Sequence, residues 1–351
     1  MTHALFSTSQ MGFGPFFQQQ LSLDEFDAAT PARVTARDGL ILQLITPSGF
    51  QRLTLPGGWR ALPVDEQPVV GDWLLLDAAG VAQRLLERSS FLARRAAGHG
   101  HHLQPMAANL STLFIVTSCN QDFNPSRLER YLTLAQEGGA APVIVLTKAD
   151  LLENPADLLR QAQRLAPGLI ALALDARQTE ARTLLAPWLG EGETVAFVGS
   201  SGVGKSTLIN TLRGEAAQAT GAIREDDAHG RHTTTSRQLL PLEGGAWLLD
   251  TPGMRELRVE ASDAGLEAVF ADVAALAERC RFRDCGHQQD DGCAVRAAVD
   301  DGEIDVRRLE NFLKLQREQG YLRESAHESR DRQRKFSKMV NSAKVTKFGR
   351  R

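Results

Sequence analysis

The feature that most constrains this chain is the order of two short motifs. A glycine-rich loop comes after a polar segment that usually follows such a loop. The loop is Gly199-Ser200-Ser201-Gly202-Val203-Gly204-Lys205-Ser206, and the polar segment is Thr147-Lys148-Ala149-Asp150. The loop matches G-x-x-x-x-G-K-[ST], with a strand-like run before it and a helix-like run after it. In that context, backbone N–H groups and a helix N-terminus can bind phosphate.

The phosphate loop predicts roles for its own residues and for the start of the helix that follows. Lys205 is expected to reach the β- and γ-phosphates of a nucleotide, and the Ser206 hydroxyl is expected to bind Mg²⁺. The residues expected to bind the nucleotide here are Gly199, Ser200, Ser201, Gly202, Val203, Gly204, Lys205, Ser206 and Thr207.

The polar segment follows a buried strand-like run and has the character of a base-reading element. The Asp150 carboxylate can accept two hydrogen bonds, from guanine N1–H and N2–H₂, and adenine offers no such pair. The Lys148 stem can cover the face of the base. Thr147 stands where asparagine is usual, so its link to the phosphate loop is expected to differ.

The order of these two elements is the reverse of that in an ordinary GTPase, where the phosphate loop comes first. This order is expected if the domain is circularly permuted. A further base-contacting loop is expected after the apolar run 169–174, where Asp175-Ala176 replaces the usual Ser-Ala. Together these segments predict a circularly permuted P-loop GTPase domain over residues 104–258.

A third motif follows another apolar strand-like run and reads Asp250-Thr251-Pro252-Gly253. Asp250 is expected to hold Mg²⁺ through water, and the Gly253 N–H is expected to contact the γ-phosphate. Before it lies Gly230-Arg231-His232-Thr233-Thr234-Thr235, in which either Thr234 or Thr235 is expected to complete the Mg²⁺ shell.

Met254 stands where many GTPases carry a glutamine that orients the attacking water, and a thioether cannot replace that amide. Slow intrinsic hydrolysis is therefore expected, with help from another group. His232 is the nearest titratable candidate, and a surface histidine without a catalytic role is the alternative. The expected catalytic residues are His232, Lys205, Thr234 and Thr235.

Four potential metal ligands occur within 14 residues in the spacing C-x₄-C-x-H-x₅-C: Cys280, Cys285, His287 and Cys293. Three thiolates and one imidazole can form a closed tetrahedral zinc site. A disulfide is the alternative, but no signal peptide is apparent, so a cytoplasmic and reducing location is expected, where disulfides are rare. One zinc ion per chain is therefore predicted.

The remaining sequence completes a prediction of a multidomain α/β protein. Residues 1–32 lack periodicity and are expected to form a flexible extension. Residues 33–103 carry short strand-like runs punctuated by Gly, Pro and Asp, which favour a small OB-fold barrel. Residues 259–351 are expected to form a helical zinc-binding domain with a basic tail. The strand-like runs of the barrel are 40–45, 51–55, 72–76 and 81–86.

The net charge of −3 does not by itself suggest a polyanionic partner, but the charge is unevenly distributed. The last 22 residues carry nine basic side chains and a single acid, Asp331. Such a tail favours contact with phosphate backbones, and a solvated tail without a partner is the alternative. No apolar run reaches membrane-spanning length, so no membrane partner is expected.

The combination of motifs resembles a family of circularly permuted bacterial GTPases called ribosome small-subunit-dependent GTPase A. The resemblance includes the permuted order, the Cys₃His cluster, Asn109 and the segment Gly71-Asp72-Trp73. It implies GTP or GDP, Mg²⁺ and Zn²⁺ as ligands. It also implies a late maturation factor that binds the 30S subunit and 16S rRNA, hydrolyses GTP on stimulation by that subunit and then leaves.

DNA is not among the implied partners, and a monomer is expected. Two other functions fit part of the pattern. One is a nucleotide-gated scaffold with little turnover, which a subunit-stimulated activity would exclude. The other is a P-loop kinase or ATPase, against which Asp150 argues.

Overall fold

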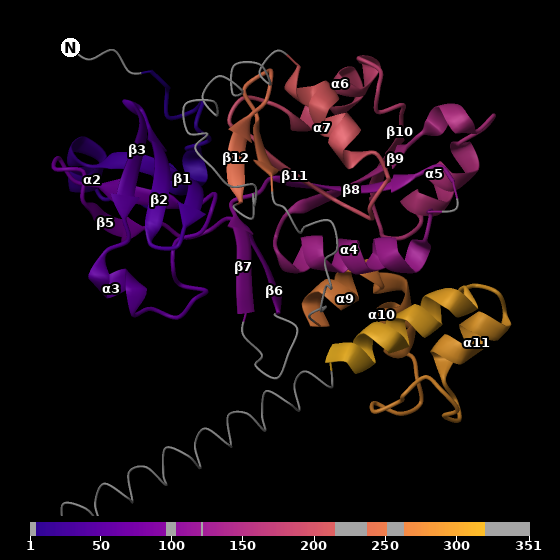
Figure 1. Ribbon diagram of the computed structural model, residues 1–351. Coiled ribbons are helices and arrows are strands. Elements are labelled where there is room, and N and C mark those ends of the chain that lie inside the picture. Colours follow the sequence, from indigo (N-terminus) through magenta and orange to yellow (C-terminus); the bar gives the residue numbers. More distant parts are fainter. Residues whose placement is uncertain (1–4, 96–102, 121, 215–236, 251–262, 320–351) are drawn as a thin grey trace, which may run out of the picture.

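The structure is a computed structural model that describes residues 5–95, 103–120, 122–214, 237–250 and 263–319. In chain order it contains a group of N-terminal strands, a central sheet with helices on both faces, and a group of C-terminal helices (Figure 1). Among the described residues, no helix is long and apolar enough to cross a membrane.

Five antiparallel strands make up the N-terminal group, which we call the barrel region. They pair in the order β3-β2-β1-β4-β5, so the first strand lies in the middle and contacts both β2 and β4. Their inward side chains, such as Val34, Leu44 and Leu74, form a separate apolar core. The strands are β1 (Thr30–Asp38), β2 (Ile41–Thr46), β3 (Gly49–Thr54), β4 (Trp73–Leu76) and β5 (Ala82–Leu85).

The four strand-like runs expected in this region correspond to β2, β3, β4 and β5. Strand β1 was not expected, because its apolar side chains are small, although their alternation with Arg33, Thr35 and Arg37 is typical of a strand. Arg33 is nevertheless buried and donates to the Met11 carbonyl at 2.8 Å and to the Thr194 hydroxyl at 2.5 Å. Strand β1 therefore joins the barrel region to the central sheet.

The segment before residue 30 differs from the expected flexible extension. Met11, Phe13 and Phe17 are buried, and the Phe13 ring meets the Trp73 ring edge-on with 4.9 Å between centroids. These side chains have no helical or strand period because they fill a gap against the barrel region. The segment contains two short helices, α1 (Pro15–Gln18) and α2 (Leu23–Ala28).

A second, two-stranded sheet, β6 (Phe91–Arg95) with β7 (Leu103–Ala108), connects the barrel region to the central sheet. Gly71 packs against Ala108, the last residue of β7, and has a φ of +97°. A Cβ on Gly71 would lie 2.0 Å from the Ala108 carbonyl oxygen. The Asn109 amide donates to the Gly71 carbonyl at 3.0 Å and accepts from the Ser89 N–H at 2.8 Å. Only glycine fits this junction without a backbone shift.

The central sheet has the order β10-β9-β8-β11-β13-β12, and only β12 runs antiparallel to its neighbours. Ala36 of β1 pairs with Gln238 of β12, which makes the barrel region continuous with this sheet. The strands are β8 (Thr112–Ser118), β9 (Ala141–Thr147), β10 (Ile170–Ala173), β11 (Thr194–Val198), β12 (Gln238–Pro241) and β13 (Trp247–Asp250).

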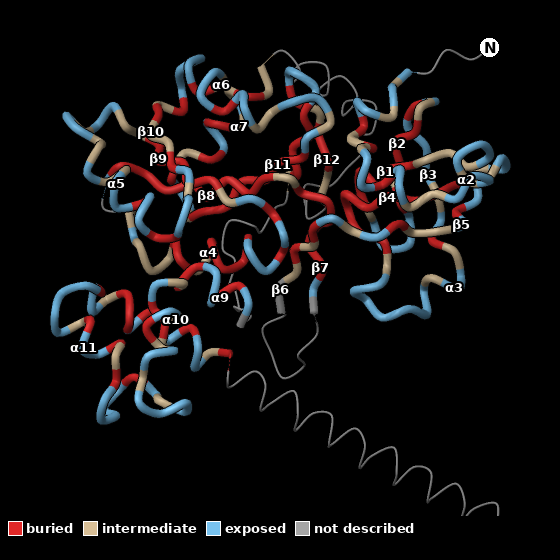
Figure 2. Tube along the Cα trace, turned by 180° about the vertical axis from the view of Figure 1, so that it is seen from behind, coloured by how far each residue is buried: buried red, intermediate tan, exposed pale blue. Residues whose placement is uncertain are grey.

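Helices cover both faces of the central sheet, and Figure 2 shows the buried strands between them. On one face, α4 (Pro125–Glu137) and α5 (Ala156–Gln163) share a core with the C-terminal helices. On the other face, α6 (Glu180–Leu185) and α7 (Lys205–Arg213) form a second core.

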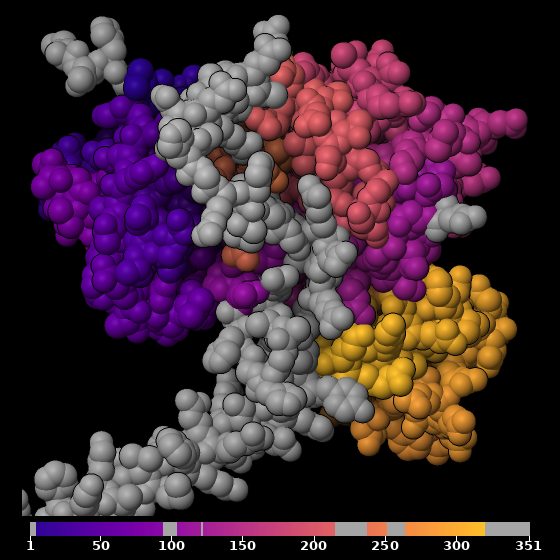
Figure 3. Space-filling view, in the orientation of Figure 1, coloured from indigo at the N-terminus to yellow at the C-terminus, as the bar shows by residue number. Residues whose placement is uncertain are grey.

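The C-terminal helices pack directly on α4 (Figure 1), and in the space-filling view the yellow C-terminal part lies against the magenta part of the molecule (Figure 3). A Cβ on Gly265 would lie 2.8 Å from the Thr133 carbonyl oxygen, so α9 approaches α4 very closely. Their apolar side chains join the same core as α4. The elements are α9 (Asp263–Val269), α10 (Ala271–Ala277), α11 (Ala294–Asp300) and a last helix over residues 306–319.

A buried acid lies at the centre of this contact. Glu129 of α4 is 0% exposed, and its two carboxylate oxygens each accept two hydrogen bonds from the last helix. Arg307 donates at 2.9 and 3.1 Å, Arg308 at 2.9 Å and Asn311 at 2.6 Å. Arg308 also donates twice to Asp272 of α10, both times at 2.7 Å. We call these five residues the Glu129 network.

Candidate nucleotide and metal sites

The phosphate loop lies between β11 and α7, as the sequence predicted. Gly199 has a φ of +144°, and a Cβ there would lie 2.1 Å from the Val116 carbonyl oxygen. Gly204 has a φ of +98° and lies against the Thr147 side chain. The glycines at these positions therefore allow the loop to lie against the ends of β8 and β9.

Lys205 begins α7 and turns its side chain back into the loop. Its ammonium donates to the Gly199 carbonyl at 2.8 Å and also to the Ser200 carbonyl. The residue is buried although it is charged. The fold thus holds a positive charge within the loop, at the N-terminus of a nine-residue helix.

The base-reading segment is joined to the phosphate loop by two side chains. The Thr147 hydroxyl donates to the Val203 carbonyl and lies 3.2 Å from the Thr117 carbonyl. Lys148 has a φ of +55°, and its ammonium donates to the Gly202 carbonyl at 2.9 Å. The hydroxyl of Thr147 therefore provides a link between the two segments, although the asparagine amide is missing.

Asp150 and Asp175 come from the ends of neighbouring parallel strands, β9 and β10, and one arginine joins them. Arg177 Nη2 donates to Asp150 Oδ2 at 2.9 Å and to Asp175 Oδ2 at 2.9 Å. Arg177 was not among the residues predicted from the sequence. Its position two residues after Asp175 was the available signal, but the pairing with Asp150 spans 27 residues.

The expected magnesium ligands are only partly described. Ser206 is exposed on the first turn of α7, and Asp250 is half-buried at the end of β13, which neighbours β11. The parallel pairing of β11 and β13 places the phosphate loop and Asp250 at the same edge of the sheet. His232, Thr234, Thr235 and Gly253 lie outside the described residues.

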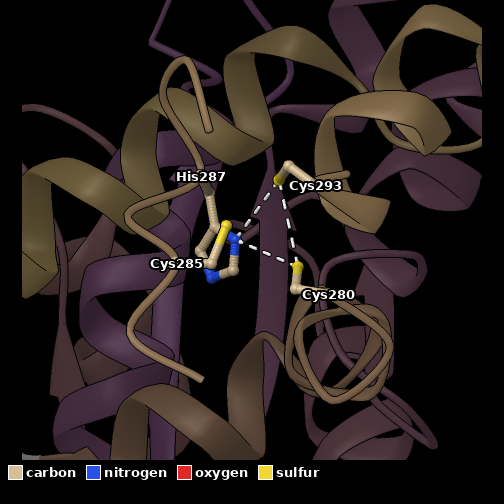
Figure 4. Close-up of side chains that lie close together, drawn as sticks. All are labelled: Cys280, Cys285, His287 and Cys293. Atoms are coloured by element: carbon tan, nitrogen blue, oxygen red, sulfur yellow. Dashed lines mark hydrogen bonds between the residues drawn. The ribbon is translucent and has the colours of Figure 1, made fainter. Parts of the chain in front are cut away.

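The four potential metal ligands converge between α10 and α11 (Figure 4). Their ligand atoms all lie within 4.8 Å of one another. Cys293 Sγ lies 3.5 Å from His287 Nδ1, Cys280 Sγ lies 3.6 Å from that nitrogen, and the two sulfurs are 3.9 Å apart. Tetrahedral zinc, with its usual bond lengths, requires separations of about 3.6 Å for sulfur to nitrogen and about 3.8 Å for sulfur to sulfur.

The chemistry of the cluster also favours a cation. Burial, together with hydrogen bonds to Cys293 and Cys280, raises the pKa of the Cys285 thiol to about 12, although a backbone N–H lowers it in part. Burial lowers the pKa of His287, which keeps its imidazole neutral. A divalent cation would stabilise the Cys285 thiolate, which these surroundings otherwise disfavour. The residues present therefore fit a metal ion.

The fold and the nucleotide site define a class of protein. A mainly parallel sheet carries a phosphate loop after β11, the segment expected to read the base after β9 and an acid at the end of β13. Along the chain, the segment after β9 precedes the phosphate loop after β11, and β12 and β13 follow both. This arrangement is that of a circularly permuted P-loop GTPase, and the predicted fold class is confirmed.

The chain belongs to the RsgA GTPase family, whose sequence profile matches residues 85–260. It is 45% identical over 344 residues to "Small ribosomal subunit biogenesis GTPase RsgA 2" of Vibrio vulnificus. The aligned region covers 97% of this chain and 96% of that one. It is 47% identical over 294 residues to "Small ribosomal subunit biogenesis GTPase RsgA" of Xanthomonas axonopodis pv. citri, with 83% and 81% covered. The predicted family is confirmed, and the protein is a GTP hydrolase.

Two solved structures share the fold. YjeQ from Thermotoga maritima superposes with a TM-score of 0.59 at 24% identity, over 83% of this chain and 98% of that one. YloQ, described as a circularly permuted GTPase, gives a TM-score of 0.59 at 22% identity, over 83% and 95% of the two chains.

Proposed function

We propose that this GTPase acts in the assembly of the small ribosomal subunit, where it binds the 30S subunit and 16S rRNA and leaves after hydrolysing GTP. The observation that carries the proposal is the extensive similarity to relatives named small ribosomal subunit biogenesis GTPases, at 45% identity over nearly the whole chain. The permuted site and the cluster of metal ligands are both present in this chain.

Within the site, we assign roles from the contacts of each side chain. Lys205 would hold the β- and γ-phosphates, because its ammonium already lies within the loop. Asp150 would accept the two guanine donors, with Lys148 against the base. Ser206, Asp250 and one threonine, Thr234 or Thr235, would hold Mg²⁺, which stabilises the charge that develops on the phosphates.

His232 is the proposed group that assists hydrolysis, since Met254 cannot orient water. The subunit would bring His232 into position, which accounts for stimulation by that partner. We further propose that Cys280, Cys285, His287 and Cys293 hold one zinc ion with a structural role, because four protein ligands close its coordination shell.

The rest of the chain is proposed to serve binding to the subunit. We interpret the barrel region as an OB-fold, since β1 pairs with both β2 and β4 around one core. The four proposed domains are residues 1–32, 33–103, 104–258 and 259–351, of which the first packs on the second. The basic tail from residue 330 would contact rRNA phosphates, in a monomeric and cytoplasmic protein that needs neither DNA nor membrane.

The proposal is tested by co-sedimentation of the full chain with purified 30S subunits. We expect binding with a non-hydrolysable GTP analogue and much weaker binding with GDP. Lys205→Ala, which should lose nucleotide binding, should remove this difference. Equal co-sedimentation in every nucleotide state, or none with any, would contradict the proposal.

A further inference from the structure

We propose that Arg177 is a positioning residue for the guanine base, which orients the Asp150 carboxylate and is itself held by Asp175. This inference rests on the proposed role of Asp150 in reading guanine. The usual Ser-Ala of the second base-contacting loop is replaced here by Asp175-Ala176. A carboxylate cannot donate a hydrogen bond to Asp150, so a different group must fix that side chain.

Asp175 holds Arg177 firmly, through three separate contacts. Arg177 Nε donates to Asp175 Oδ1 at 3.0 Å, Nη2 donates to Oδ2 at 2.9 Å, and the Arg177 backbone N–H donates to Oδ1 at 3.0 Å. The two-pronged contact of a guanidinium with a carboxylate has a fixed geometry. The guanidinium is therefore anchored on Asp175.

From this anchor, Arg177 reaches Asp150 with a single hydrogen bond. Its Nη2 lies 2.9 Å from Asp150 Oδ2, and no second contact between these two side chains occurs among the described residues. A carboxylate oxygen can accept more than one hydrogen bond, so this contact leaves both Asp150 oxygens able to accept from a base. The arginine orients the carboxylate without occupying it.

Charge supports the same assignment. Asp150 and Asp175 would repel each other if no cation lay between them, and guanine O6 would face an added negative charge. The hydrogen bonds from Arg177 lower the pKa of Asp175 to about 2. Asp175 therefore stays ionised at neutral pH, and its hold on Arg177 does not change over the range in which the protein functions.

Two other interpretations of the contact are possible, and they predict different results. Most exposed ion pairs contribute little, and the Arg177 side chain is 65% exposed, so the pair could have no effect on the base. Alternatively, Arg177 could compete with guanine for Asp150. The three contacts with Asp175 argue against competition, because the arginine need not leave when the base arrives.

The test compares GDP with inosine diphosphate, which lacks the 2-amino group, by calorimetry on the full chain. Arg177→Ala should weaken GDP binding by about tenfold, since the bond involves two charged groups. Binding of inosine diphosphate should weaken less, because it needs one oriented oxygen and not two. The preference for GDP should therefore narrow, and Arg177→Lys should restore part of it.

Two further variants complete the test. Asp175→Asn should give an intermediate loss, since it weakens the anchor and keeps the arginine. Arg160→Ala removes a similarly exposed ion pair with Asp157 on α5 and should change nothing. GDP binding by Arg177→Ala that equals or exceeds that of the unmodified protein would overturn the proposal. If the unmodified protein does not prefer GDP to ADP, the base-reading role of Asp150 fails instead.

Discussion

Glu129→Gln should loosen the C-terminal helices from the GTPase part. Each Glu129 oxygen accepts from two donors, so the amide nitrogen of glutamine must face two donors whichever way it turns. The better orientation points it at Arg307, which water can reach, and at Asn311, which is 6% exposed. The variant then leaves one buried donor and the new amide N–H without an acceptor.

Each such group costs about 1–3 kcal/mol, so the two together cost about 2–6 kcal/mol, which includes the range of about 3–5 kcal/mol for breaking a buried ion pair. Arg308 retains its bonds to Asp272, which reduces the penalty. We expect a total of about 3 kcal/mol. Because the chain has several parts, the measurement is native-state hydrogen exchange of amides in residues 306–319. Their protection should fall on the order of a hundredfold.

The matched control lies in the same contact. Glu318 of the last helix accepts from Arg130 of α4 at 2.7 and 2.8 Å, but these side chains are 35% and 24% exposed. Glu318→Gln should therefore cost less than about 1 kcal/mol. Equal loss of protection in the two variants would refute the reasoning, because burial would then not determine the cost.

Four further predictions concern other parts of the chain. Gly71→Ala should cost more than about 2 kcal/mol in thermal unfolding, because its Cβ would strike the Ala108 carbonyl; Gly58→Ala, with open space around it, is the control. Cys293→Ser should lose zinc by elemental analysis and unfold the C-terminal helices, whereas Cys119→Ser should keep the metal; a zinc-free but folded variant would contradict this. Asp150→Asn should weaken GDP binding by about 1–3 kcal/mol and improve binding of xanthosine diphosphate, and unchanged affinities for both would exclude the base-reading role. His232→Ala should reduce subunit-stimulated turnover with nearly unchanged GTP affinity, and normal stimulated turnover would leave His232 without a catalytic role.

The motifs of the nucleotide site could be predicted because each follows a continuous apolar run. Parallel strands buried on both faces have such runs, and the polar residue after the last apolar one marks the carboxyl end of the strand. This holds for Thr147 at the end of β9 and for Gly199 directly after β11.

Other features could not be predicted because they depend on contacts between distant segments. Phe13 and Phe17 show no period, and they are buried by packing against Trp73 and the rest of one apolar cluster. The two-stranded sheet of β6 and β7 was not among the strand-like runs expected from the sequence, and it forms by pairing across the residues between them. Glu129 looks like an exposed helix residue until the last helix supplies its partners.

The same limit applies to the base-reading site. The replacement of Ser-Ala by Asp175-Ala176 looked like a local departure from the usual pattern. The structure adds the arginine that joins Asp175 to Asp150. The contact of Arg177 with Asp150 forms because β9 and β10 end side by side. The sequence of the second loop alone therefore could not predict this contact.

The most direct test of the proposed function is the rate of GTP hydrolysis by the full chain with and without purified 30S subunits. We predict slow turnover by the protein alone, because Met254 replaces the glutamine that orients water. We predict much faster turnover with 30S subunits and no such increase with 50S subunits. The same rate under all three conditions would contradict the account and would favour a nucleotide-gated scaffold.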